Sequence, residues 1–176
     1  MELWKIYDKN GDYTGLKVDK DDKRAWEENS FHQGVDAWII NSENKILIQK
    51  RAPQKKREPN MWSMSVGGSV INDEEILDAL QREATEELGI KLNMENAQRI
   101  RRYRLSNLWL DVYLVKQDVT LSNIKLKEDE VSDIKFASFD EIEKIYDNNM
   151  FMKNRWEFVR DEILENIKNN CDEDGE

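Results

Sequence analysis

The segment 68–90 is the part of this sequence that most constrains the fold. Within residues 73–88, apolar residues recur at helical spacing, and Gly89 follows at the place where a glycine typically ends a helix. The apolar positions are Leu77, Leu80, Ala84 and Leu88. We therefore predict an amphipathic helix over residues 73–88 that buries this stripe.

Three glutamates of the predicted helix share one face. Glu83, Glu86 and Glu87 stand at positions i, i+3 and i+4, and like charges one turn apart repel each other. A hard cation relieves this repulsion, because Mg²⁺ and Mn²⁺ prefer oxygen ligands. An acidic helix face is ordinarily only solvated, so the metal-site interpretation depends on the residues around it.

The rest of the chain alternates between strand and helix patterns. Strands are predicted over residues 3–7, 35–40, 45–49, 99–104, 108–115 and 134–137. A capping box at Ser138 opens a helix that reaches about Tyr146. A last helix is predicted over about 155–167, with Trp156, Val159, Ile163 and Ile167 buried. Strands on both sides of a helix indicate an α/β sandwich around a mixed sheet.

Length and charge limit the classes of function. The chain has 176 residues and a net charge of −10, which fits one domain over residues 1–170 and argues against binding duplex nucleic acid. Within that domain we expect an N-terminal hairpin or extension (1–30) and a C-terminal helix (150–170), followed by an acidic tail (171–176). A single cysteine, no signal peptide and no membrane-length apolar run predict a cytoplasmic, soluble protein.

The spacing across segment 68–90 resembles a known sequence signature. Its fixed positions are Gly68, Glu74, Arg82, Glu83, Glu86, Glu87, Gly89 and an apolar Ile90. On this pattern the chain is identified as a member of the Nudix hydrolase family. The resemblance implies an α/β/α sandwich around a mixed β-sheet. In this fold, segment 68–90, which we call the box, forms a loop-helix-loop. The same resemblance implies hydrolysis of a small-molecule diphosphate with Mg²⁺ or Mn²⁺ as cofactor.

The resemblance also implies roles for single residues. Glu83, Glu86 and Glu87 are expected to bind the metal, together with the carbonyl group of Gly67. The expected catalytic residues are Glu86, Glu87, Glu130 and Arg82, with the general base either on the helix or at Glu130 in a later loop. Glu74 and Arg82 are expected to form a salt bridge that supports the box, while Gly68 and Gly89 shape its loops.

Similarity outside the box points to one branch of the family. His32 ahead of Trp38 and the segments 49–52 and 61–68 are similar to isopentenyl-diphosphate isomerase. That enzyme needs a cysteine at the position of Gly67, and glycine cannot relay a proton. We therefore favour hydrolysis of a nucleoside diphosphate linked to another moiety. Isomerase-like activity and a non-catalytic nucleotide-binding regulatory module remain the alternatives.

Three further residues are candidates for substrate binding. Arg51 is suited to a phosphate because a guanidinium matches phosphate oxygens. Trp62 either stacks on a base or packs in the core. For His32 a substrate contact or a structural role is favoured over binding the metal. A homodimer is compatible with the resemblance, but no residue of the sequence establishes it.

Overall fold

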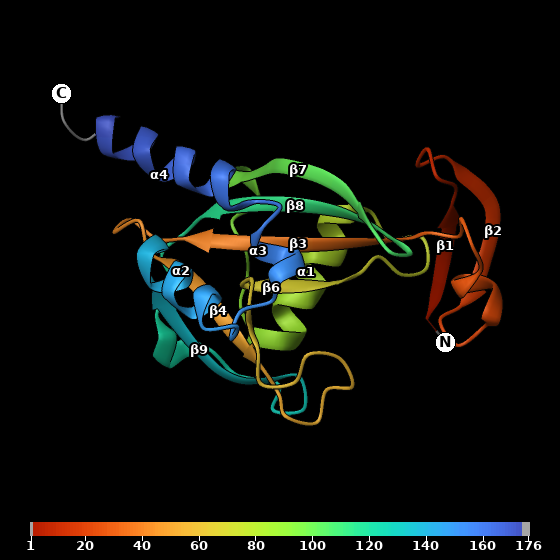
Figure 1. The fold of residues 1–176 in the computed structure, drawn as a ribbon, viewed down its shortest axis with the longest axis horizontal. Coiled ribbons are helices and arrows are strands. Elements are labelled where there is room, and N and C mark those ends of the chain that lie inside the picture. Colours follow the sequence, from red (N-terminus) through yellow and green to blue (C-terminus); the bar gives the residue numbers. More distant parts are fainter. Residues whose placement is uncertain (1, 174–176) are drawn as a thin grey trace.

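A computed structural model describes residues 2–173 of the chain (Figure 1). Its strands are β1 (Leu3–Tyr7), β2 (Tyr13–Asp19), β3 (His32–Ile40), β4 (Ile46–Arg51), β5 (Trp62–Ser63), β6 (Val66–Ser69), β7 (Ala97–Leu105), β8 (Leu108–Lys116) and β9 (Val131–Ala137). Its α-helices are α1 (Ile76–Leu88), α2 (Phe139–Asp147), α3 (Lys153–Trp156) and α4 (Arg160–Glu173). Short 3₁₀ turns are η1 (Lys23–Trp26), η2 (Met94–Asn96) and η3 (Leu121–Asn123).

The main sheet is mixed, as predicted. Its strand order is β5-β4-β3-β8-β7, and β6 and β9 pair with β3 and β4 respectively. β3 runs parallel to β8 along its whole length, whereas the other pairs are antiparallel. β4 pairs with β3 only near the end of β3, so β6 can pair with the earlier part of β3. This arrangement places the start of the box against the central strand.

Helices cover both faces of this sheet. On one face, Ala79, Leu80, Ala84 and Leu88 of α1 pack with Val35, Ala37 and Ile39 of β3. On the other face, residues of α2, α3 and α4 pack with Trp38 and Ile40 of β3. Successive residues of β3 thus enter opposite cores, which makes all of β3 buried. The predicted α/β/α sandwich is confirmed, and no helix of residues 2–173 is both long and apolar enough to cross a membrane.

The N-terminal residues form the predicted hairpin. β1 and β2 pair as a separate two-stranded sheet with a small core of Trp4, Ile6, Val18 and Ala25. Tyr7 bridges to Phe31, just before β3. Figure 1 shows the hairpin beyond the end of the sheet where β3 starts, opposite the end from which α4 extends. The hairpin therefore sits where it can form one wall of a site.

Three details differ from the sequence prediction. Helix α1 starts at Ile76 because Glu75 is extended, and Leu77 in its first turn is 37% exposed, so its predicted burial is wrong. Ala79 takes its place beside Leu80 in the core. The predicted helix over 155–167 is two helices, because a turn at 157–159 redirects the chain between Trp156 and α4. Helix α4 continues to Glu173, and residues 174–176 of the predicted tail lie outside the described part.

Candidate active site

The box joins the central sheet to one covering helix. β6 pairs with β3 so that Gly67 lies opposite Asp36, and the chain then loops into α1. The apolar side of α1 is buried against the sheet, which directs its glutamates toward β6 and the loops. Gly89 ends the helix in the left-handed conformation, with φ 65° and ψ 28°. This left-handed glycine agrees with the predicted helix stop.

The two glycines of β6 allow neighbouring side chains to approach the strand more closely than a Cβ atom would without a shift of those side chains. A Cβ atom at Gly68 would overlap the carboxylate of Glu83, and one at Gly67 would overlap Asp36 and Met64. Glycine at both positions therefore lets two carboxylates lie directly against the strand.

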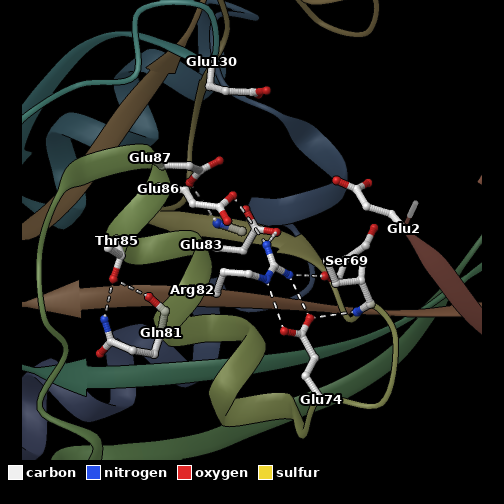
Figure 2. Close-up of polar contacts among 12 residues, drawn as sticks. Glu2, Ser69, Glu74, Gln81, Arg82, Glu83, Thr85, Glu86, Glu87 and Glu130 are labelled. Atoms are coloured by element: carbon white, nitrogen blue, oxygen red, sulfur yellow. Dashed lines mark hydrogen bonds and ion pairs between the residues drawn. The ribbon is translucent and has the colours of Figure 1, made fainter.

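Arg82 ties the loop of the box to its helix (Figure 2). Its Nη2 atom lies 2.8 Å from Glu74 Oε1 and 2.9 Å from the carbonyl oxygen of Ser69. Its Nη1 atom donates to Glu83 at 2.8 Å. Arg82 thus holds Glu83 on one side and the loop on the other. Its ion pair with Glu74 is the salt bridge expected for the box.

Glu87 is the most deeply buried carboxylate of the helix, with 8% of its surface exposed. It accepts hydrogen bonds from Gln49 Nε2 at 3.0 Å and from the backbone N–H of Gly67 at 3.4 Å. Burial, reinforced by repulsion from Glu83, raises the pKa of Glu87 to about 8. Burial also raises the pKa of Glu83. Both groups are carboxylates held where a negative charge is unfavourable unless a cation accompanies it.

These glutamates line a cleft of about 320 Å³, which we call the carboxylate cleft. Gly67, Glu83, Glu86, Glu87 and Glu130 all face it, and Figure 2 shows Glu130 on the far side of the cleft from Glu83. Glu130 forms an ion pair with Lys55, and the Nζ atom of Lys127 lies 3.9 Å from Glu130 Oε1. Arg51 completes a cationic rim. The cleft therefore combines carboxylates with cations suited to a phosphate group.

The donor atoms of the carboxylate cleft suit a hard divalent cation. Within residues 2–173, no three acidic, histidine or cysteine side chains converge closely enough to enclose an ion by themselves. Mg²⁺ does not require such a cage, because it is usually held by one or two carboxylates while water and substrate phosphates supply the other oxygens. The buried, mutually repelling pair of Glu83 and Glu87 fits that mode of binding.

Comparisons with known proteins identify the family of this chain. The family description NUDIX domain matches residues 30–161. This chain belongs to the Nudix hydrolase family. An uncharacterized Nudix hydrolase of Listeria monocytogenes is 31% identical over 152 residues, which cover 86% of this chain and 89% of the relative. As a family member, the chain is a Nudix pyrophosphohydrolase.

This Nudix hydrolase is also similar to a curated isomerase and to a solved structure. An isopentenyl-diphosphate Delta-isomerase of Pectobacterium atrosepticum is 28% identical over 144 residues, covering 78% of this chain and 76% of the isomerase. The crystal structure of DR0079 from Deinococcus radiodurans has a TM-score of 0.75 and 22% identity, covering 90% of this chain and 98% of the other. The second similarity supports the fold.

Of the predicted substrate residues of this Nudix hydrolase, His32 and Arg51 line one pocket, whereas Trp62 lies elsewhere. Trp62 is in β5 and packs toward the core on the α2 side, with Lys135 Nζ 4.8 Å from its ring. It does not line the carboxylate cleft, so its position favours packing over a stacked substrate. His32 stacks on Trp4 with ring centroids 3.8 Å apart. His32 and Trp4 line a second pocket beside the cleft. Arg51 lines both this pocket and the cleft.

Several site residues are absent from the sequence prediction. Gln49 holds Glu87, and Lys55 pairs with Glu130. Asp36 lies under Gly67 and pairs with Arg155 from α3. The sequence could have indicated Asp36 as a site residue, since it is the one charged residue in the otherwise apolar strand pattern at 35–40. Lys55 had none, because it stands in a run of basic residues that reads as a solvated loop.

Proposed function

We propose that this Nudix hydrolase cleaves the phosphoanhydride bond of a nucleoside diphosphate linked to another moiety, with Mg²⁺ or Mn²⁺ as cofactor. The observation that carries the proposal is the carboxylate cleft itself. It brings the three box glutamates, the Gly67 strand and Glu130 to one cavity whose rim is cationic. In a helix whose acidic face had no function, the glutamates would be solvated, whereas Glu87 is buried beside another carboxylate.

In this proposal Glu83, Glu86, Glu87 and the carbonyl of Gly67 would hold one or more cations, with water and substrate oxygens as the remaining ligands. When bound, the cation neutralises the diphosphate oxygens and increases the acidity of the attacking water. The side chains of Arg51, Lys55 and Lys127 then orient the phosphates from the opposite rim. Arg82 and Glu74 keep Glu83 in place.

We assign the general base to Glu130. It faces the cleft from the loop before β9, where its ion pair with Lys55 keeps the side chain directed inward. From there its carboxylate can accept the proton of a water that attacks phosphorus in line. Glu86, whose side chain is 47% exposed, is the alternative base on the helix.

The test is a hydrolysis screen with nucleotides, dinucleotides, nucleotide sugars and prenyl diphosphates in the presence of Mg²⁺ or Mn²⁺. We expect release of a phosphate-containing product from at least one nucleoside diphosphate derivative. Glu87→Gln should lower kcat/KM by at least about 100-fold, the upper end of what even outer-shell partners of a metal contribute. Glu130→Gln should lower kcat by about 100-fold or more, within the range of general-base catalysis.

Glu128→Gln is the matched control, because Glu128 is an exposed glutamate of the same loop that does not line the cleft. It should leave kcat unchanged. Hydrolysis at wild-type rate by Glu87→Gln would refute the metal site. Double-bond isomerisation of a prenyl diphosphate without phosphate release would support the isomerase alternative, and nucleotide binding without turnover would support the regulatory one.

We also expect the enzyme to act in the cytoplasm on small molecules. Whether it forms the homodimer compatible with the family is measured by light scattering on the purified chain.

A further inference from the structure

A second pocket adjoins the carboxylate cleft. We call it the inner pocket and define it by Trp4, Trp26, His32, Asp36, Asn107 and Arg155. Its volume is about 330 Å³, at the low end of small-molecule sites. Trp4, Arg51, Gly67, Gly68 and Ser69 line both cavities, so the two are neighbours across the glycine strand. A substrate with its diphosphate in the cleft therefore has room for an attached group in the inner pocket.

An ion pair lies at the floor of the inner pocket. Asp36 is 1% exposed, and its Oδ2 atom lies 2.7 Å from Arg155 Nε. The carboxylate reaches from Gly67 on one side to Arg155 on the other, because a Cβ at Gly67 would overlap Asp36 Oδ1. Two elements distant in sequence, β3 and α3, are thus joined at the point where the two cavities meet.

This ion pair is poorly explained by stability alone. Desolvating two charges costs about as much as their attraction returns, so a buried pair is weak evidence of a stabilising role. Asp36 Oδ2 and Arg155 Nε are also not aligned to hydrogen-bond each other, although they are close. Each of these two atoms is buried without a hydrogen-bond partner among the described residues. Asp36 supplies an acceptor and Arg155 a donor beside it. This pair matches the edge of a heterocyclic base, which presents a donor beside an acceptor.

The walls of the inner pocket share this polar character. Buried nitrogen atoms of Trp4, His32 and Asn107 have no hydrogen-bond partner within the described residues. Trp26 is 45% exposed and meets Trp4 edge to face at 5.6 Å, so part of its ring is accessible from the pocket. Arg57 lies 5.4 Å from the same ring. A prenyl chain would give these buried nitrogen atoms no hydrogen-bond partner, whereas a polar group would.

We propose that Asp36 and Arg155 are specificity-determining residues that bind the base of a nucleoside diphosphate substrate in the inner pocket. The inference rests on the proposed function, and it adds residues outside the box. It also explains the glycine at position 67. A side chain at that position would meet Met64 Cε and Asp36 Oδ1, so an isomerase cysteine there would require Asp36 to move from its present position.

The first test measures binding without turnover. Nucleoside monophosphates are titrated against the protein in EDTA while tryptophan fluorescence is followed, because Trp4 and Trp26 line the pocket. We expect saturable quenching by at least one nucleoside monophosphate and none by ribose 5-phosphate. Equal effects of the two would refute base recognition, whatever the hydrolytic activity is.

The second test uses variants and two kinds of substrate. Asp36→Asn and Arg155→Lys should raise KM for the best nucleoside diphosphate substrate by about 10- to 100-fold, the loss expected for a hydrogen bond to a charged group. For methyl diphosphate, which cannot reach the inner pocket, KM should change by less than about 3-fold. Wild-type kcat/KM for geranyl diphosphate should be at least about 100-fold below that for the nucleoside substrate.

Asp111→Asn is the matched control. Asp111 is also a fully buried aspartate paired with an arginine, 3.3 Å from Arg99, but it does not line the inner pocket. It should leave the KM ratio between the two substrates unchanged. If Asp36→Asn does not fold, Arg155→Lys and the wild-type comparisons still decide. Unchanged ratios in a folded variant overturn this inference alone, whereas failure to cleave any diphosphate overturns the proposed function.

Discussion

At the scale of single residues, Glu87 is the clearest link between structure and chemistry. It is buried beside another carboxylate, and its hydrogen-bond partners are Gln49 and the backbone of Gly67. Such an arrangement opposes the charged form of Glu87 in the protein alone and favours it when a cation is present. Replacing Glu87 by a neutral residue should therefore not lower the stability of the metal-free protein, but it should remove the stabilisation that a bound metal provides.

The first prediction follows for Glu87→Gln. In EDTA this variant should have a Tm equal to or above that of the wild type, because a neutral amide replaces a group whose charge is unfavourable there. Mn²⁺ at about 100 times its Kd should raise the wild-type Tm by roughly 5–10 °C, since such binding contributes about 2.7 kcal/mol. The variant should show little rise. Equal metal-induced shifts measured by calorimetry would contradict the assignment.

Arg82 is a positioning residue in this account. It holds Glu83 and Glu74 with a planar guanidinium that lysine cannot imitate. Arg82→Lys should raise the metal concentration needed for half-maximal activity by about 10- to 100-fold, as measured by Mn²⁺ titration of the rate. Arg101→Lys, at an exposed pair with Glu162, is the control. A lower rate with an unchanged metal requirement would show that Arg82 acts on something other than the metal site.

At the scale of elements, the box positions its glutamates through both of its ends. β6 supplies glycines that allow the close approach, and Gly89 stops α1 in the left-handed conformation. The N-terminal hairpin brings Trp4 against His32 at the start of β3. Each of these junctions gives a stability prediction.

Gly89→Ala should lower the free energy of unfolding by about 1–2 kcal/mol, because a Cβ atom is disfavoured in the left-handed region. Gly89→Asn should lose less, since asparagine tolerates that conformation. Urea unfolding of the two variants tests the order. Equal losses would mean that crowding against Lys125, whose Cβ lies 3.2 Å from the Cβ that such a variant adds, dominates instead.

His32 gives a pH prediction. Burial lowers its pKa to about 4, from an ordinary value of 6.5. The unfolded state therefore takes up the proton first as the pH falls, so the stability that neutral His32 contributes is full above pH 6.5 and is lost toward pH 4. Between pH 7.5 and 5.5 the wild type should lose about 1.4 kcal/mol more than His32→Phe in urea unfolding. Parallel losses in both proteins would refute this.

The sequence predicts the elements whose patterns are local. The box helix, its glycine stop, the capping box at Ser138 and the N-terminal hairpin all appear in the structure. The strands β5 and β6 escape prediction because they are short and β6 carries two glycines, which are poor strand formers. Exposed Leu77 and the turn at 157–159 depend on where each helix meets the sheet, which periodicity alone does not specify.

At the scale of the whole molecule, the functional groups gather around β3 and β6, where elements from both faces of the sheet meet. α1 provides the carboxylates and β6 the glycines beside them, the loops before β5 and β9 provide Lys55 and Glu130, and β3 and α3 provide Asp36 and Arg155 of the inner pocket. The spacing of the box makes the first set predictable. The pairing of Asp36 with Arg155 is not, because it depends on how the C-terminal segment folds back onto the central strand.

The central claim is that the carboxylate cleft directs water to phosphorus. The most direct measurement is turnover of the best nucleoside diphosphate derivative in ¹⁸O-enriched water with Mn²⁺, followed by mass spectrometry of the products. The account predicts one solvent oxygen in a phosphate group of a product, at a rate that falls sharply in Glu87→Gln. Label on carbon, or cleavage that is indifferent to Glu87, would contradict it.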